Sequence, residues 1–150
     1  MENITSQQFE LRLSQTAADY LKESAKWSFF LAIVGFIGIG FMVLLAVFMS
    51  TFMSSMAQNP AMGVMGQMQG MLSAIYILFA VLYAFPIYYL YKYATDAKTA
   101  LVTANSDLLE TALGYLKSHH KFLGIMMIVI LSLYALIFIG AIGVGIFAAV

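Results

Sequence analysis

Four methionines spaced three residues apart are the first candidates for chemistry in this chain. They are Met62, Met65, Met68 and Met71, and they lie in a stretch, residues 50–71, that carries no charge. Thioether sulfur is a soft ligand that suits Cu(I). The stretch contains no His, and the chain has no Cys. Methionine is also a flexible apolar filler and contact residue. We therefore expect an apolar loop at a membrane interface, with a protein-contact surface and Cu(I) handling as alternatives.

A second candidate is the pair His119–His120. Adjacent side chains on a helix point about 100° apart, so they do not readily share one metal ion. Lys117 and Lys121 flank the pair, which favours a role facing lipid headgroups, with pH sensing as the alternative. The sequence contains no HExxH, GxSxG or phosphate-loop motif. We expect a protein that is not an enzyme and holds no cofactor.

The composition places these residues in a membrane protein. The chain is 63% hydrophobic and 9% charged, with a mean hydropathy of +0.92, whereas soluble domains carry about 25% charged residues. No Asp, Glu, Lys or Arg lies within residues 27–91 or 122–150. A helical span needs about 20 apolar residues, so these two regions predict three spans, at about 27–53, 71–91 and 122–147.

The predicted fold class is an all-α membrane protein whose three spanning helices extend into a small cytoplasmic helical bundle. The expected segments are a tail (1–14), a juxtamembrane helix with the first span (15–53) and a Met-rich extracytoplasmic loop (54–70). The second span with its extension (71–103), a turn (104–106), a helix with the third span (107–147) and a C-terminal end (148–150) follow. Asn105 and Ser106 are suited to capping a helix, which places the turn there.

Basic residues predict the orientation. In the three-span arrangement they all fall on one side, and Lys and Arg near span ends favour the cytoplasm. They are Arg12, Lys22, Lys26, Lys92, Lys98, Lys117 and Lys121. We therefore expect the N-terminus inside and the C-terminus outside, with anionic headgroups as partners of Lys22, Lys26, Lys117 and Lys121. The formal net charge is +0, and we expect no nucleic-acid partner.

Two groups of glycines are candidates for close helix packing, because small residues let membrane helices approach each other. They are Gly35, Gly38 and Gly40 in the first span and Gly140, Gly143 and Gly145 in the third. Counted from the cytoplasmic end, the first group lies roughly 12–20 Å deep and the second roughly 27–35 Å deep. Each group should therefore meet bulky side chains of a neighbouring helix rather than the other group.

The spans contain no carboxylate, Lys, Arg or His. Proton relays and ion-coupled transporters usually place such groups in the membrane, so the sequence disfavours these classes. Tyr83, Ser132 and Tyr134 are candidates for a polar contact inside the membrane, since their predicted depths are similar. A hydrogen bond between membrane helices contributes about 0.6 kcal/mol, which indicates a packing role.

Three stretches carry a family resemblance: "YLKESAKW" (20–27), "FPIYYLYKYA" (85–94) and "LLETALGYLKSHHKFLGIMMIVILSLYALIFI" (108–139). They resemble a family of small three-span inner-membrane proteins of Gram-negative bacteria that is described only as a domain of unknown function. The resemblance implies a multi-pass protein of the bacterial inner membrane with no assigned activity. It transfers no site residues.

These observations lead to one functional expectation and two alternatives. Three spans form a thin bundle with a large lipid-facing surface, and the glycine groups favour self-association. We expect a homo-oligomeric scaffold or assembly component. The alternatives are an oligomeric channel or conduit for small solutes or lipid and, as a minor one, Cu(I) handling through the Met-rich loop.

Overall fold

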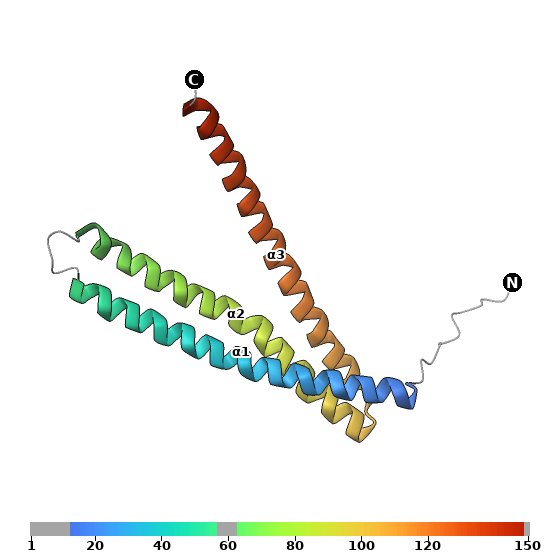
Figure 1. Cartoon of the computed structure of the whole chain (residues 1–150). Helices are drawn as coiled ribbons and strands as arrows, with labels where there is room; N and C mark the ends of the chain where they lie inside the picture. Colours follow the sequence, from blue (N-terminus) through green and yellow to red (C-terminus); the bar gives the residue numbers. More distant parts are fainter. Residues whose placement is uncertain (1–12, 57–62, 149–150) are drawn as a thin grey trace.

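The computed structural model describes residues 13–56 and 63–148, and the side chains of residues 13–55 and 70–142. It consists of three helices, α1 (Gln15–Met56), α2 (Gly63–Thr103) and α3 (Ser106–Ala148), drawn in Figure 1. All three are long and apolar enough to cross a membrane. No strand occurs in the described ranges. The predicted all-α architecture with three helices able to span a membrane is therefore confirmed. A helix suits this environment because lipid cannot form hydrogen bonds with free backbone N–H and C=O groups.

The Met-rich loop is shorter than the predicted range of 54–70. α1 continues to Met56 and α2 begins at Gly63. Polar residues at the end of α1 do not break the helix because their hydroxyls donate to carbonyls of the same helix, from Ser54 to Thr51 at 2.8 Å and from Ser55 to Phe52 at 2.6 Å. At the start of α2, Met and Gln are good helix formers and outweigh the glycines.

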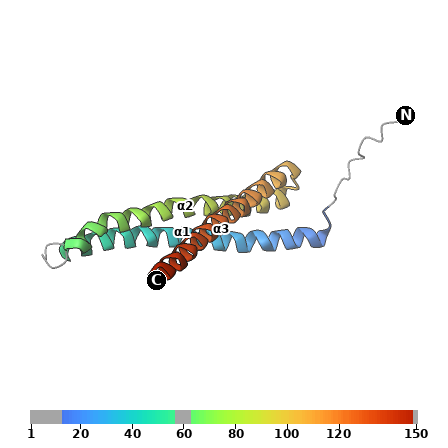
Figure 2. The same cartoon turned by 90° about the horizontal axis from the view of Figure 1, so that it is seen from above.

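α1 and α2 form an antiparallel pair that lies side by side over most of its length in both ribbon views (Figures 1 and 2). The buried or half-buried residues of α1 recur in steps of three and four, the period of a left-handed coil of helices. They are Ala18, Leu21, Ala25, Ser28, Ala32, Gly35, Ile39, Met42, Ala46, Ser50 and Met53, with Ala17 and Leu45 half-buried beside this row. Small side chains dominate this seam, so the two backbones can approach closely.

α3 follows the same period but contacts its neighbour over only part of its length. The half-buried or buried residues Leu108, Ala112, Tyr115, His119, Phe122 and Met126 form its packed stripe, and they pack mainly against α2. From residue 127 to 142 every residue is exposed. In Figures 1 and 2 this part of α3 leaves the α1–α2 pair, so the molecule has two diverging arms.

The arms meet at a tight turn between α2 and α3. Ala104 has a φ of 49°, in the left-handed region, and the amide of Asn105 donates to the carbonyl of Ala100 at 3.0 Å. This pairing resembles a Schellman helix end. The side-chain oxygen of Asn105 then accepts from the amide of Leu108 at 3.0 Å, which caps α3. The turn falls within the expected residues 104–106.

Replacing Ala104 by Gly should stabilise the protein. A left-handed conformation costs a residue with a Cβ atom about 1–2 kcal/mol, and the greater freedom of glycine in the unfolded chain offsets part of the gain. We expect a net gain of about 0.5–1 kcal/mol in SDS titrations in mixed micelles followed by circular dichroism. The matched control Ala18→Gly, within a helix, should lower stability by up to about 1 kcal/mol. Equal losses in both variants would contradict the turn geometry.

Candidate functional site at the junction of the three helices

The three helices meet in a small core at the charged end of the molecule. It consists of Ala25 from α1, Tyr93 and Ala97 from α2, and Ala112 from α3. Leu90, Tyr115 and Leu116 pack around it. Tyr93 is 1% exposed, and its hydroxyl lies 3.2 Å from the hydroxyl of Ser24. A buried tyrosine hydroxyl needs such a partner, so this hydrogen bond ties α1 to α2 beside the core.

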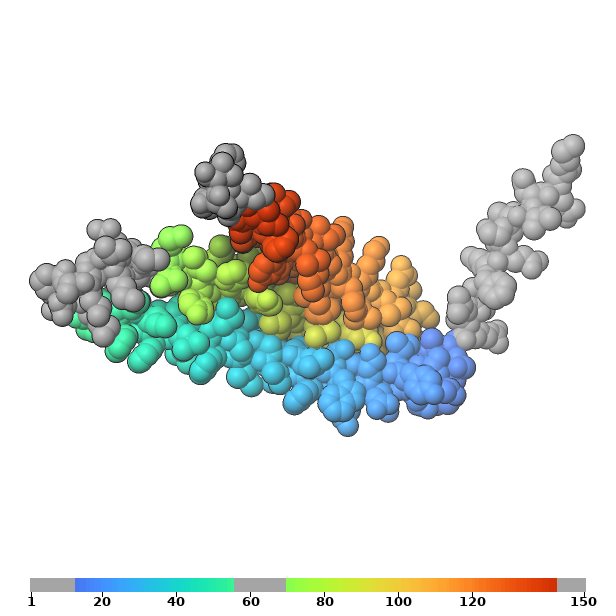
Figure 3. All heavy atoms as spheres, turned by 45° about the horizontal axis from the view of Figure 1, so that its top comes forward, coloured from blue at the N-terminus to red at the C-terminus, as the bar shows by residue number. Residues whose placement is uncertain are grey.

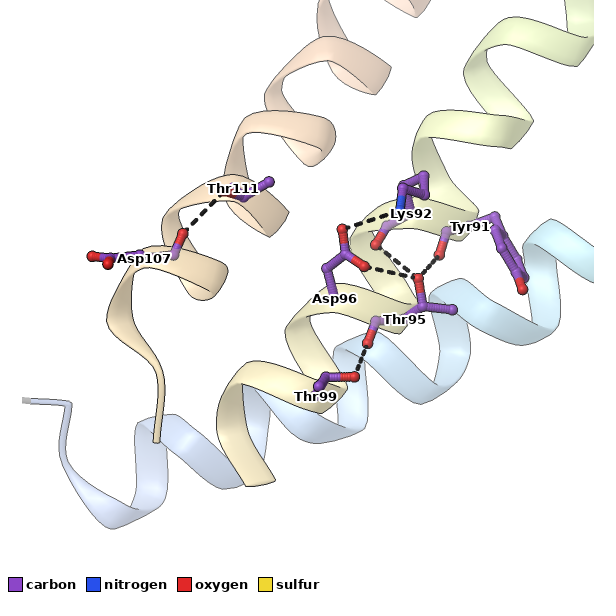
Figure 4. Close-up of polar contacts among 7 residues, drawn as sticks. All are labelled: Tyr91, Lys92, Thr95, Asp96, Thr99, Asp107 and Thr111. Atoms are coloured by element: carbon purple, nitrogen blue, oxygen red, sulfur yellow. Dashed lines mark hydrogen bonds and ion pairs between the residues drawn. The ribbon is translucent and has the colours of Figure 1, made fainter. Parts of the chain in front are cut away.

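A polar cluster on α2 lies beside this core (Figure 4). The ammonium of Lys92 is 3.6 Å from the carboxylate of Asp96 and 5.7 Å from the ring centre of Tyr115. The hydroxyl of Thr95 bonds to the backbone oxygens of Tyr91 and Lys92 at 3.1 Å and to Asp96 at 3.3 Å. Partly exposed ion pairs contribute little to stability. The cation over Tyr115 nevertheless adds a contact between α2 and α3.

His119 forms the second polar contact between α2 and α3. Its Nδ1 lies 2.7 Å from the carbonyl oxygen of Pro86. A carbonyl only accepts, so Nδ1 must carry the proton and donate. His120 instead bonds through Nδ1 to the carbonyl of Leu116 in its own helix, at 2.9 Å. The two histidines therefore differ in role: His119 holds α3 against the proline segment of α2, and His120 is exposed.

The packing glycines fall into two groups. A Cβ atom added to Gly35 would come within 2.8 Å of Ile87 on α2, so this glycine permits the close approach of α1 and α2. Gly38, Gly40 and Gly140 have nothing within 4 Å of such an atom. Gly143 and Gly145 lie in the backbone of α3, beyond the described side chains. Within one chain, only Gly35 of the described glycines borders a neighbouring helix this closely.

Tyr83, Ser132 and Tyr134 are not brought together. Tyr83 is 45% exposed and Tyr134 is 68% exposed. The hydroxyl of Ser132 donates to the carbonyl of Ile128 in its own helix at 2.8 Å. The reason is the divergence of α3, because Ser132 and Tyr134 lie beyond Met126, the last half-buried position of this helix. The predicted depths place these residues at one level in the membrane, but depth does not determine the angle between α3 and the α1–α2 pair.

The methionine pattern is only partly described. Met62 lies outside the described residues, Met65 and Met68 lie in the first turns of α2, and the side chain of Met71 is 66% exposed. Within the described ranges no group of three or more His, Asp or Glu side chains could hold a metal ion. The Cu(I) alternative rests on thioethers and stays a prediction.

Comparison with known protein families, curated proteins and solved structures finds no match for this chain. The family resemblance of the sequence therefore stays a prediction.

The α1–α2 seam can be tested at Gly35. We expect Gly35→Leu to lower stability by about 1–3 kcal/mol, because the added atoms overlap with Ile87. Gly38→Leu adds the same side chain three residues away, where a Cβ atom meets nothing, and should change the stability of the monomer little. SDS titration of the monomer, followed by circular dichroism, measures both. A larger loss in Gly38→Leu would contradict the seam.

The hydrogen bond of His119 can be tested against its neighbour. His119→Ala should lower stability by about 0.5–1.5 kcal/mol, the usual contribution of one hydrogen bond, and should speed amide exchange in the first half of α3. His120→Ala removes an exposed ring bonded within its own helix and should leave both measurements near the wild type. Equal effects of the two substitutions would show that His119 does not hold the arms together.

Proposed function

We propose that this protein is a homo-oligomeric scaffold or assembly component of a bacterial inner membrane, with no enzymatic activity. The single observation that carries the proposal is the free apolar half of α3, in which no residue from 127 to 142 is even half-buried within the chain. A second copy would supply the neighbour that this helix lacks. The N-terminus of each chain would lie in the cytoplasm, because the lysines at the end of the molecule where the three helices meet favour that side.

Exposure of apolar side chains does not by itself favour association in a membrane, because lipid tails cover such surfaces as well as a protein does. Close packing at small residues provides the driving force. Gly38 and Gly40 lie on α1 with open space where a Cβ atom would be, and Gly140 lies on α3 in the same situation. These open glycines are therefore available for contact with another chain.

The depths of these residues suggest which helices meet. Counted from the ends of the uncharged segments, Gly38 and Gly40 lie about as deep as residues 133–136 of α3. Leu133 and Leu136 are 55% and 66% exposed. In the proposed contact, the leucines of α3 from one chain pack over Gly40 of α1 from another, since Gly38 and Gly40, two residues apart on the helix, lie on different faces. This heterologous contact can build a closed ring.

The contact can be mapped by single-cysteine crosslinking, since the chain has no cysteine of its own. Four consecutive exposed positions of α3 sample a full helical turn: Leu136, Ile137, Phe138 and Ile139. Each is replaced by Cys in one chain, which is co-expressed with a second, differently tagged chain whose only cysteine replaces Leu44 of α1, 67% exposed and one helical turn from Gly40. After oxidation in native membranes, we expect disulfides between the two differently tagged chains at one or two of the four positions. Gly40→Leu should reduce the crosslinking, because a bulky side chain then fills the space that the partner would occupy.

Two results would count against the proposal. Equal crosslinking at all four positions would indicate random collision. No crosslinking at any position, together with a monomer on blue-native gels in mild detergent, would exclude stable self-association. A cysteine at Val102, which is 75% exposed at the charged end, serves as the control for collisions outside the span.

A further inference from the structure

An open groove of about 840 Å³ lies between α1 and α2 at the charged end of the molecule. Its volume is in the range of ligand-binding clefts. Its walls carry Asp19, Lys22, Glu23 and Lys26 from α1 and Lys98 from α2. Three cations and two carboxylates give it an excess of one positive charge.

The two walls place like charges opposite each other. The rings of Phe29 and Tyr91 contact each other, with centres 5.8 Å apart. Because α1 and α2 run antiparallel, moving seven residues along each helix from this pair leads to Lys22 and Lys98 at one level. Both lysines line the groove. Two ammonium groups on facing walls favour the binding of an anion between them.

Asp19 and Glu23 line the same groove, but neither forms an ion pair with these lysines. The ion pair Lys92–Asp96 is the only one among the described residues, so Lys22, Lys26 and Lys98 have no described carboxylate within 4.0 Å. The hydroxyl of Thr99, on the wall formed by α2, donates to the carbonyl of Thr95 at 2.9 Å. The groove therefore offers three free ammonium groups to an anion.

The floor of the groove and its depth in the membrane indicate what kind of anion fits. Ala25, Phe29, Ala94 and Val102 provide apolar surface, and Phe29 belongs to the uncharged segment that enters the membrane. Lys26 is the last charge before this segment. Lys22 lies one turn, about 6 Å, further out, which matches the headgroup layer outside the hydrocarbon core. A phospholipid places an anion at this level, with an apolar tail attached to it.

We propose that this groove binds the phosphate group of a phospholipid, with Lys22, Lys26 and Lys98 as its ligands. The apolar floor near Phe29 receives the start of the acyl chains. Asp19 lies at the outer end, where it can accept a hydrogen bond from the hydroxyl or ammonium group of the headgroup, and Glu23 lies between Lys22 and Lys26 along α1. The site is complete within one chain and does not depend on self-association.

Native mass spectrometry of the full chain in uncharged detergent tests this site. The probes are phosphatidylglycerol, diacylglycerol with the same acyl chains, and inorganic phosphate as competitor. The test variant K22Q/K98Q removes the facing lysines, and the control K117Q/K121Q removes two lysines of α3 that do not line the groove. K22R/K98R keeps the charge. Glutamine and arginine both preserve helix propensity.

We expect the wild type to retain one phosphatidylglycerol and K22Q/K98Q to bind it about tenfold or more weakly, with K117Q/K121Q and K22R/K98R within about twofold of the wild type. Equal losses in the two glutamine variants would show non-specific attraction and overturn the site. If diacylglycerol bound as tightly as phosphatidylglycerol, the phosphate group would not contribute to binding, and the proposal would be wrong. Displacement of the lipid by millimolar inorganic phosphate would assign the groove to free phosphate instead.

Discussion

The arrangement of the three helices depends on the burial of Tyr93. It is the only large side chain that is completely buried among the described residues, and the other buried positions are alanines and Pro86. A ring of this size, packed among Ala25, Ala97 and Ala112, fixes the distance between the helices at the junction. The hydroxyl bond to Ser24 fixes the register of α1 on α2. Away from the junction, alanine and glycine let α1 and α2 approach each other.

The same argument explains why α3 leaves the pair. Membrane helices associate through close packing, since lipid provides no hydrophobic force between them. The apolar half of α3 consists mostly of isoleucine, leucine, phenylalanine and valine, and it presents few small residues on which a neighbour could close. α3 therefore stays attached through the residues before Met127, aided by His119 on the carbonyl of Pro86. Figure 3 shows the orange start of α3 against the yellow part of α2.

Much of this fold could be predicted from the sequence, because the length of an uncharged apolar segment determines whether it can form a membrane-spanning helix. The three helices and the turn near Asn105 follow from hydropathy and capping. The length of the Met-rich loop could not be predicted, since Ser54 and Ser55 look like helix breakers until their hydroxyls bond back to the helix. The contact of His119 with Pro86 was not predicted either. The position of His119 next to His120 in the sequence does not indicate that its ring meets a backbone carbonyl of another helix. The separation of Ser132 from Tyr83 depends on an angle between helices, which depth alone does not contain.

The distribution of charge at the junction follows from how the helices are joined there. The contacts that hold the three helices together are mostly neutral: an alanine core, a tyrosine hydroxyl and an imidazole on a carbonyl. One ion pair, Lys92–Asp96, is added within α2. Because charged side chains form few of the contacts between the three helices, Lys22, Lys26 and Lys98 take no part in holding the helices together. Their ammonium groups have no ion-pair partner among the described residues, and they lie beside apolar side chains near the start of the uncharged segment of α1, in a groove with one more cation than carboxylates.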